Sequence, residues 1–389
     1  MKKNINKFYA DPILKEINFG GDNSWMLDLI NTEEFERLGR IHQLGFSNII
    51  FPSATHTRFS HSLGTYEITR RFIEHLELNK KNKLECKYLL CAALLHDIGH
   101  GPFSHTFETY TNTNHEEFTK QLICNKNSNL CRILTENGID PKKVIEILSK
   151  KTIHKWAVSL IDSQIDSDRM DYLNRDSRYT GAAYGQINPT YIIKGSVLIN
   201  DQICFNKKII SEIENLLIGR FHMYKQVYEH KNTIKYEFLI QAIFKRIKYL
   251  FLKKYKFVDK RNLINSFKPI FENKNFTNEQ FLELDDSLFS VFIESLKYEN
   301  DPILKKLLKA HTKPNFITIK QIKTNNKNSI NNDFLSGYYT TKNVCIYHTN
   351  IDPIYINDNG KPIELSKLSE IIKKLSNVSY KATYVVKIN

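Results

Sequence analysis

Apolar residues recur at helical intervals along most of the chain. Between positions 32 and 250 they are spaced three and four residues apart in long segments, and clusters of Gly, Pro and Asn separate these segments. In the segment 84–96, apolar side chains follow this spacing until Gly99 stops it. The pattern predicts a helix that carries His96 and Asp97 at its C-terminal end.

Two further stretches indicate the rest of the fold. The stretch 209–255 contains no proline and a single glycine, so it predicts one or two long helices. Beyond it, the polar run 325–332 predicts a loop, and the segments 344–347 and 384–388 have strand composition on either side of a helical 365–375. We therefore expect a mainly α protein with a small C-terminal α+β appendage.

The change in character along the chain suggests four parts. We expect an N-terminal tail, frayed or docked as a strand on a partner, then a helical core, a helical extension and a C-terminal α+β subdomain. Their boundaries are placed at 1–30, 31–255, 256–324 and 325–389.

Composition narrows the class of protein further. Of 389 residues, 41% are hydrophobic, and with only 14 Gly and 10 Pro the chain is neither collagen-like nor wholly disordered. The 56 Lys and Arg outnumber the 42 Asp and Glu, and the net charge of +14 favours anionic partners such as nucleotides, nucleic acids or acidic lipids. A drift in base composition explains the excess equally well, since Lys, Asn and Ile are abundant throughout.

The cysteines and the apolar runs indicate the cellular environment. The six Cys form no C-x-x-C pair, and no apolar run approaches the roughly 20 residues of a membrane span. We therefore expect a cytoplasmic protein with reduced thiols and no membrane contact.

Histidine and acidic residues gather in the segment 92–108, AALLHDIGHGPFSHTFE. At a helix end, the adjacent His96 and Asp97 can converge on one ion, and imidazole nitrogen with carboxylate oxygen suits Fe, Mn, Zn or Ni better than Ca. Apolar neighbours bracket this pair, and a cation would relieve the cost of its burial. The alternative is that these polar groups only cap the helix end.

Three motifs together resemble a known superfamily. They read TRFSHSLG at 57–64, HDIGHGPFSH at 96–105 and DRMDYL at 168–173. In this order they are similar to the motifs of HD-domain phosphohydrolases, and within these to the deoxynucleoside triphosphate triphosphohydrolases, the branch that includes the sterile-alpha-motif/HD restriction factor. The resemblance covers about 31–231 without a SAM domain, and it implies an HD-domain helical bundle.

The resemblance assigns the chemistry to particular residues. It implies one divalent transition metal (Fe, Mn, Zn or Ni), with Mg²⁺ accompanying the nucleotide, and four ligands: His61, His96, Asp97 and Asp168. His100, Glu108 and His115 match positions assigned to acid–base catalysis, for which the ordinary pKa of histidine is well suited. Glu108 departs from the pattern, because many relatives carry Asp there and the extra methylene group moves the carboxylate.

Two helix faces are candidate walls of a substrate site. Asp168, Tyr172 and Asp176 share one face by their i, i+4, i+8 spacing, and a helix surface with salt bridges through Arg169 and Arg175 is the alternative. A second face is expected to hold Arg220, Tyr224, Val227, Tyr228 and Lys231. Its guanidinium and ammonium groups can hold a polyphosphate, and its tyrosines can stack on or bond to a sugar. The substrate contacts that the resemblance implies are Gln43, Leu44, Arg58, His105, Arg169, Tyr172, Asp176, Arg220, Tyr228, His230 and Lys231.

The segment 30–40 departs from the pattern of members that a guanine nucleotide activates. Where those members use an Asp, a Gln and an Arg, this chain has Asn31, Glu36 and Gly39. The change weakens the expectation of a nucleotide activator, although Arg37 and Arg40 are expected to keep some positive charge there. The resemblance also implies a homo-oligomer, a dimer or tetramer with nucleotides bound between subunits.

These inferences lead to one functional prediction and two alternatives. The chain is predicted to be a metal-dependent hydrolase that converts deoxynucleoside triphosphates to deoxynucleoside and inorganic triphosphate. One alternative is another phosphohydrolase, either an HD phosphodiesterase or nucleotidase or a single-strand nuclease. The other is a weakly catalytic scaffold that senses nucleotides or binds nucleic acid, although the sequence has no RNP or KH signature.

Overall fold

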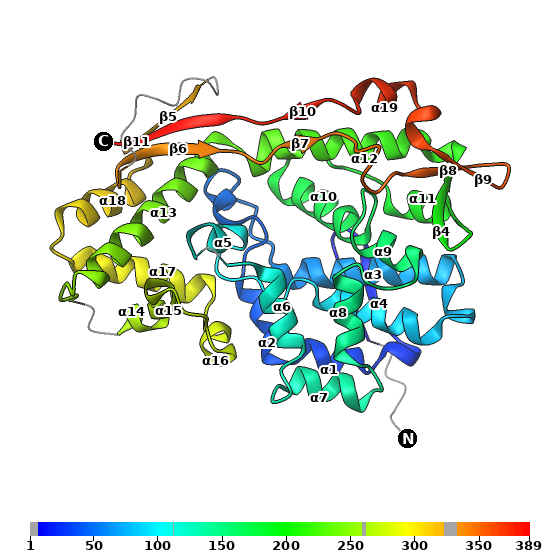
Figure 1. The fold of residues 1–389 in the computed structure, drawn as a ribbon, viewed down its shortest axis with the longest axis horizontal. Coiled ribbons are helices and arrows are strands. Elements are labelled where there is room, and N and C mark those ends of the chain that lie inside the picture. Colours follow the sequence, from blue (N-terminus) through cyan, green and yellow to red (C-terminus); the bar gives the residue numbers. More distant parts are fainter. Residues whose placement is uncertain (1–6, 112, 259–261, 323–332) are drawn as a thin grey trace.

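The protein is mainly helical, as the sequence predicts (Figure 1). The computed structural model describes residues 7–111, 113–258, 262–322 and 333–389. The central helices and those that cover them are α3 (Arg58–His75), α4 (Lys83–Leu95), α8 (Pro141–Leu148), α9 (Lys155–Ile161) and α10 (Ser167–Thr180). α3 packs against both α4 and α10, while α8 and α9 pack on α4. The predicted helix at 84–96 is α4, and His96 is its C-terminal cap.

Local sequence fixes both ends of α10, the helix that carries Asp168. The carboxylate of Asp166 accepts a hydrogen bond from the backbone N–H of Arg169 at 2.6 Å, which satisfies a donor of the first turn. At the other end, Gly181 has a left-handed backbone with φ 71°, a conformation that glycine adopts without strain. These two signals place Asp168, Tyr172 and Asp176 along one helix, as their spacing predicts.

Two long helices lie between 209 and 255. They are α12 (Ile210–Met223) and α13 (Lys231–Leu252), and a turn of π-helix, Tyr224–Tyr228, separates them. The break interrupts the helical repeat, so Val227 is buried in the core whereas Lys231 is exposed. The expectation that Arg220 and Lys231 share one continuous face is therefore wrong.

The N-terminal segment is not a free tail over its described part, which corrects that expectation. β1 (Lys7–Asp11) and β2 (Lys15–Phe19) form an antiparallel hairpin, and β2 packs on α3. Leu14, Ile17 and Phe19 are buried there, and the stacked rings of Phe19 and Tyr66 lie 4.3 Å apart. The hairpin belongs to the core because its alternating side chains cover the outer face of α3.

Smaller helices complete the described chain. Those on the N-terminal side of α12 are α1 (Met26–Ile30), α2 (Glu33–Glu36), α5 (His105–Thr111), α6 (His115–Ile123), α7 (Asn129–Glu136) and α11 (Pro189–Lys194). Those of the expected extension are α14 (Leu263–Ser266), α15 (Lys268–Glu272), α16 (Asn278–Leu282), α17 (Asp286–Ser295) and α18 (Pro302–Thr312). Among the described residues, no helix has both the length and the apolar character needed to cross a bilayer.

The C-terminal strands run along α12 and α13 (Figure 1). One antiparallel sheet has the order β5-β11-β6, and its strands are β5 (Ile317–Ile322), β6 (Ser336–Thr340) and β11 (Thr383–Ile388). β11 contains the predicted strand at 384–388, whereas the prediction at 344–347 is reduced to β7 (Val344–Cys345), paired with β10 (Ser379–Tyr380). The helix predicted at 365–375 is a 3-10 turn, Leu365–Lys367, followed by α19 (Glu370–Leu375). The loop predicted at 325–332 lies outside the described residues.

A second sheet joins the C-terminal part to the core. Its order is β3-β4-β8-β9, with strands β3 (Ser196–Ile199), β4 (Gln202–Asn206), β8 (Tyr355–Asp358) and β9 (Lys361–Glu364). β4 and β8 are parallel, and the other pairs are antiparallel. The β3–β4 hairpin lies in a region expected to be helical, and β5 begins before the boundary expected at 325. The appendage is therefore part of one packed body with the core.

Arg37 is a buried structural residue rather than a surface charge. Its side chain is fully buried and donates hydrogen bonds to the carbonyl oxygens of Ile98, His100 and Leu284 at 2.7–3.0 Å. Arg40 is half-exposed, and its guanidinium pairs with Asp285 at 2.6 Å. The expectation that both arginines keep positive charge at the surface is wrong for Arg37, because its donors are used to hold the loop after α4.

The N-terminus of α17 holds the same loop from another side. The carboxylate of Asp286 accepts hydrogen bonds from the backbone N–H of Phe103 at 2.6 Å and from the backbone N–H of His42 at 2.9 Å. Phe103 and Ser104 both have φ near 56°, a left-handed conformation that costs energy for residues with a Cβ atom. The extension therefore holds strained backbone directly after the HD motif.

We expect Asp286→Asn to destabilise the protein by about 1–3 kcal/mol, because one of the buried donors loses its charged acceptor. Urea unfolding of the variant measures the loss, and hydrogen exchange at the Phe103 amide should rise. Glu294→Gln, at an exposed position of the same helix, is the matched control. An unchanged unfolding midpoint and unchanged exchange in Asp286→Asn would show that the loop does not depend on this contact.

Candidate active site

Side chains from α3, from the end of α4 and from α10 meet at one place. His61 lies on α3, His96 and Asp97 follow α4, and Asp168 is in the first turn of α10. His61 Nε2 is 2.9 Å from Asp168 Oδ1 and 3.3 Å from His96 Nε2, and His96 Nε2 is 3.3 Å from Asp97 Oδ1. Ligand atoms bonded to one ion at about 2.0–2.2 Å are about 3 Å from their neighbours. His61, His96 and Asp168 could therefore hold a divalent metal ion, and Asp97 lies beside them.

The second nitrogen of each imidazole is already occupied. His61 Nδ1 is 2.8 Å from Asp171 Oδ2, and His96 Nδ1 is 2.9 Å from the carbonyl oxygen of Ala93. Each acceptor fixes the proton on Nδ1 and leaves Nε2 as the ligand atom, the arrangement found around metal-binding histidines. The residues fit a metal for this reason as well as by distance.

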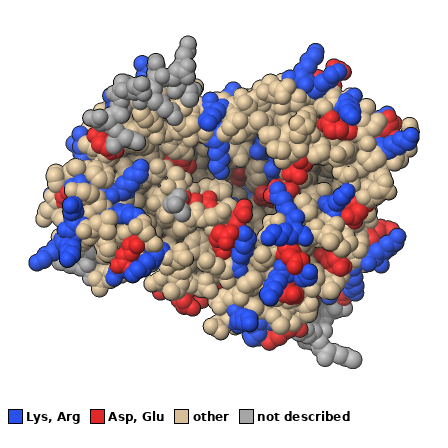
Figure 2. Space-filling view, viewed as in Figure 1, with Lys and Arg blue, Asp and Glu red and all other residues tan. Residues whose placement is uncertain are grey.

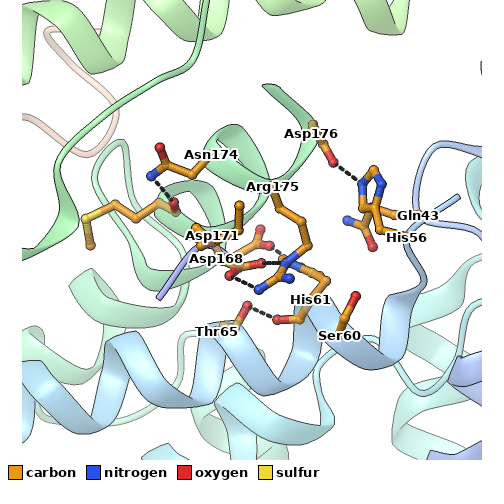
Figure 3. A network of polar contacts seen from close by, with 12 residues as sticks. Gln43, His56, Ser60, His61, Thr65, Asp168, Asp171, Asn174, Arg175 and Asp176 are labelled. Carbon is orange, nitrogen blue, oxygen red and sulfur yellow. Dashed lines mark hydrogen bonds and ion pairs between the residues drawn. The ribbon is translucent and has the colours of Figure 1, made fainter. Parts of the chain in front are cut away.

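An ion-pair network supports His61 from behind (Figure 3). Arg175 contacts both carboxylate oxygens of Asp171 at 2.8 Å and reaches Asp11 of β1 at 2.9 Å. α3 can approach this network because it has Gly64 there, where an added Cβ atom would lie 1.9 Å from Asp171 Oδ1. Sequence reasoning missed Asp171, although its place in the motif DRMDYL was a usable signal.

The charges at the site are set by neighbouring groups. Burial lowers the pKa of His61, but hydrogen bonds to Asp168 and Asp171 outweigh it and raise that pKa to about 10. Burial would raise the pKa of Asp97, but Arg58, with Nη1 at 2.6 Å from Oδ2, and nearby imidazoles hold it well below its usual range. Both carboxylates of the group are therefore ionised, and an ion bound at His61 Nε2 would take the place of a proton.

Three further imidazoles form a separate group around Glu108. The carboxylate contacts His115 Nδ1 at 2.6 Å and His105 Nδ1 at 2.7 Å, and it also accepts the backbone N–H of His115. The rings of His100 and His115 are stacked 4.0 Å apart at 11°. A metal lies near the plane of each imidazole that binds it, so two parallel stacked rings do not share one ion. His100 and His115 are therefore not suited to bind one second metal ion together.

Glu108 is ionised, whereas His100 is neutral. Burial would raise the pKa of Glu108, but the hydrogen-bonded imidazoles of His105 and His115 outweigh it and hold it far below its usual 4.5. Burial, with the charges of Arg58 and His115, holds the pKa of His100 well below its usual range. A neutral imidazole therefore lies between the candidate metal group and a carboxylate-clamped imidazole.

A cavity of about 750 Å³ brings most of the expected site residues together. Its lining includes Gln43, Leu44, Arg58, His96, Asp97, His100, His105, His115, Asp168, Arg169, Tyr172, Asp176, Arg220 and Tyr228. His61 and Glu108 lie behind this surface, each in contact with residues that line it. His230 and Lys231 do not line the cavity, and the ring of His230 packs near Phe51 instead.

The sequence did not indicate the wall that the C-terminal part supplies. Tyr338, Tyr339 and Thr340 of β6, with the following Lys342, line the cavity opposite the motifs. The Tyr339 hydroxyl donates to Glu237 of α13, and Glu229 accepts the backbone N–H of Lys342 at 3.0 Å. No short motif marks these residues, since only the pairing of β6 with β11 places them there.

The chain is similar to proteins that contain an HD domain or are named as phosphohydrolases. The HD domain family matches residues 58–176. An uncharacterised protein of Mycoplasma genitalium is 32% identical over 96% of this chain and 93% of its own length. The deoxynucleoside triphosphate triphosphohydrolase SAMHD1 homolog of Dictyostelium discoideum is 30% identical over 57% of this chain and 46% of its own length. The solved structure of a phosphohydrolase from Bacteroides thetaiotaomicron has a TM-score of 0.84 at 27% identity, over 99% of this chain and all of that one.

Asp168→Ala and His96→Ala are each expected to lose bound metal, because each removes one ligand of the group. Asp171→Asn keeps every ligand and should weaken metal affinity by about 10–100-fold through the orientation of His61. Elemental analysis and metal titration measure these effects, with the exposed Glu136→Gln as control. Full metal content in Asp168→Ala would contradict the assignment.

We expect the contribution of Glu108 to the free energy of unfolding to decrease as the pH is lowered. Its folded-state pKa is depressed below 4.5, so its contribution is complete at neutral pH and is lost as the pH falls below the unfolded value. The difference in unfolding free energy between the wild type and Glu108→Gln should therefore shrink as the pH is lowered from 7 to 4. A difference that is constant or grows over this range would show that the carboxylate is not ionised against the two imidazoles.

Proposed function

The chain belongs to the HD-domain phosphohydrolases, and on that premise we propose that it hydrolyses deoxynucleoside triphosphates to deoxynucleoside and inorganic triphosphate. One observation carries the proposal. The candidate metal group, the imidazoles clamped by Glu108, a Tyr–Asp wall and several cations all lie at one cavity. The resemblance of the site motifs to triphosphohydrolases and the Dictyostelium relative of that name support the choice of substrate.

The cations of the cavity suit a polyphosphate. Arg58, Arg169 and Arg220 line it from three different segments, and Lys120 and Lys342 add positive charge at other parts of the wall. Arg220 uses Nη1 for the carbonyl oxygen of Cys345 at 3.3 Å, while its buried Nε has no hydrogen-bond partner among the residues that the structure describes. A guanidinium with unused donors beside a cavity is suited to a phosphate oxygen.

The Tyr–Asp wall suits the sugar. Tyr172 and Asp176 of α10 face the cavity with Tyr228, whose hydroxyl donates to Asp176 Oδ2 at 2.8 Å. The aromatic rings limit the space beside the carboxylate, since Tyr172 and Tyr228 are 6.2 Å apart at their centroids. We propose that this wall accepts a deoxyribose and binds its 3′-hydroxyl at Asp176.

The clamped imidazoles supply the acid–base groups. A water oxygen bonds to the α-phosphorus and the water gives up one proton. The bond from that phosphorus to the 5′-oxygen breaks, and the 5′-oxygen takes up one proton, so the proton count is unchanged. His115 is the candidate donor, because Glu108 fixes its Nδ1 and leaves Nε2 to exchange the proton. A divalent ion held by His61, His96, Asp97 and Asp168 would polarise a phosphoryl oxygen.

The alternative functions make different demands on the same surfaces. A nucleotidase that acts on monophosphates has no use for three arginines that line the cavity from separate segments. On the face shown in Figure 2, Lys and Arg are interspersed with Asp and Glu, so the positive charge is not gathered there into one continuous surface for nucleic acid. Hydrolysis of a triphosphate is favoured for these reasons over binding alone.

The segment expected to bind an activator offers few free charges. Arg37 is buried in contacts to backbone carbonyls, and Arg40 is paired with Asp285. We therefore propose that a guanine nucleotide does not activate this chain through the segment 30–40, while the homo-oligomer implied by the resemblance remains a prediction. The rate of dNTP hydrolysis with and without GTP tests activation, and light scattering measures the oligomeric state.

The proposed reaction predicts inorganic triphosphate as the phosphate product. Metal-loaded protein incubated with each of the four dNTPs should release triphosphate and deoxynucleoside, and Asp168→Ala should release neither. Arg220→Ala should raise the KM by about tenfold or more, because it removes a charged contact to phosphate. Lys245→Ala, an exposed cation of the neighbouring α13, is the control. Release of pyrophosphate or orthophosphate would reject the reaction type.

A further inference from the structure

Asp176 is held by two hydrogen-bond donors. His56 Nε2 lies 2.6 Å from Oδ1 (Figure 3). The Tyr228 hydroxyl donates to Oδ2. Tyr228 lines the cavity with Asp176, whereas His56 does not. One oxygen of the carboxylate therefore points to a buried ring, and the other belongs to the cavity side.

The surroundings of His56 fix its orientation and its proton. The side chain is 1% exposed and its ring stacks on Tyr179, with centroids 4.7 Å apart and planes at 22°. Its Nδ1 is buried and has no hydrogen-bond partner within the described part of the chain, so a proton on that atom would have no acceptor there. Nε2 therefore carries a proton and donates it to the Asp176 carboxylate.

The backbone around His56 also holds Gln43, another of the expected substrate contacts. The His56 carbonyl oxygen accepts the backbone N–H of Gln43 at 3.0 Å, and His42 forms a β-bridge with Thr57. This short pairing places Gln43 at the cavity. His56 thus contacts Asp176 through its ring and Gln43 through its main chain, and both of these residues line the cavity.

We propose that His56 is a positioning residue that sets the orientation in which Asp176 accepts the 3′-hydroxyl of the substrate. This inference rests on the proposed function and deepens it, because it assigns a requirement for a 3′-hydroxyl to one buried contact. His56 donates to Oδ1. Oδ2 accepts the Tyr228 hydroxyl on the cavity side and has a second lone pair for a hydroxyl of the nucleotide. Without the ring, the carboxylate would lose a donor and could turn away from that direction.

The proposal predicts a defect confined to substrates that carry a 3′-hydroxyl. His56→Phe keeps a ring that can stack on Tyr179 but removes the donor. It should raise the KM for a deoxynucleoside triphosphate by about tenfold while kcat stays within about twofold, because a hydrogen bond to a charged group is lost in binding. The KM for the matching 2′,3′-dideoxynucleoside triphosphate should not change. His56→Gln, which retains a side-chain N–H donor, should recover most of the difference.

A double-mutant cycle with Asp176→Asn gives the matched control. Asp176→Asn should reduce the preference for the deoxy over the dideoxy substrate, and His56→Phe should add nothing further in that background. A general packing defect would instead raise the KM for both substrates, or it would raise the KM of the double variant above that of Asp176→Asn. Either of those results, or an unchanged KM for both substrates in His56→Phe, would overturn the proposal.

Failure of the proposed function is distinguishable from failure of this inference. If the wild type cleaves no dNTP, the proposed function fails. The contact is then tested by calorimetric binding of deoxy and dideoxy triphosphate analogues in which a methylene group replaces the 5′-oxygen. A loss of affinity in His56→Phe for the deoxy analogue alone supports the positioning role, and an equal change for both, or none, rejects it.

Discussion

The site depends on the ion-pair network that joins α3 to α10. Arg175 holds Asp171 through both carboxylate oxygens, and Asp171 in turn holds His61. All three side chains are buried, where a charge left without its partner is strongly destabilising. Because these contacts require close approach of the two helices, they also fix where Asp168 meets His61. The network extends to Asp11, so the N-terminal hairpin supports the same centre.

We propose three different tasks for histidine in this protein, namely metal binding, proton transfer and positioning, and the partner of each ring decides the task. His61 and His96 give Nδ1 to a carboxylate and a carbonyl oxygen, which leaves Nε2 as a ligand atom. His115 is held by Glu108 for proton transfer, whereas His56 gives Nε2 to Asp176 for positioning. Residue type alone does not separate these tasks, since the choice depends on which nitrogen has an acceptor within reach.

The extension and the appendage complete the centre although they contain none of its motifs. Asp286 of α17 and the buried Arg37 hold the loop that follows the HD pair, including the left-handed Phe103. β6 then closes the side of the cavity that faces α13. The HD helices bring the reactive groups together, but the parts added after them hold the loop in a strained shape and limit the volume available to a ligand.

The sequence by itself determined the mainly helical class, α4 with His96 and Asp97 at its end, and the shared face of Asp168, Tyr172 and Asp176. These features follow from the spacing of apolar residues and from the residues that begin and end each helix, and both can be read from the sequence. Only the tertiary structure decided the supports of the site: Asp171 and Arg175 behind His61, His56 behind Asp176, and β6 across the cavity. It also placed Arg37 in the core and separated Lys231 from Arg220. Burial and pairing between distant segments set these outcomes, and no local pattern records them.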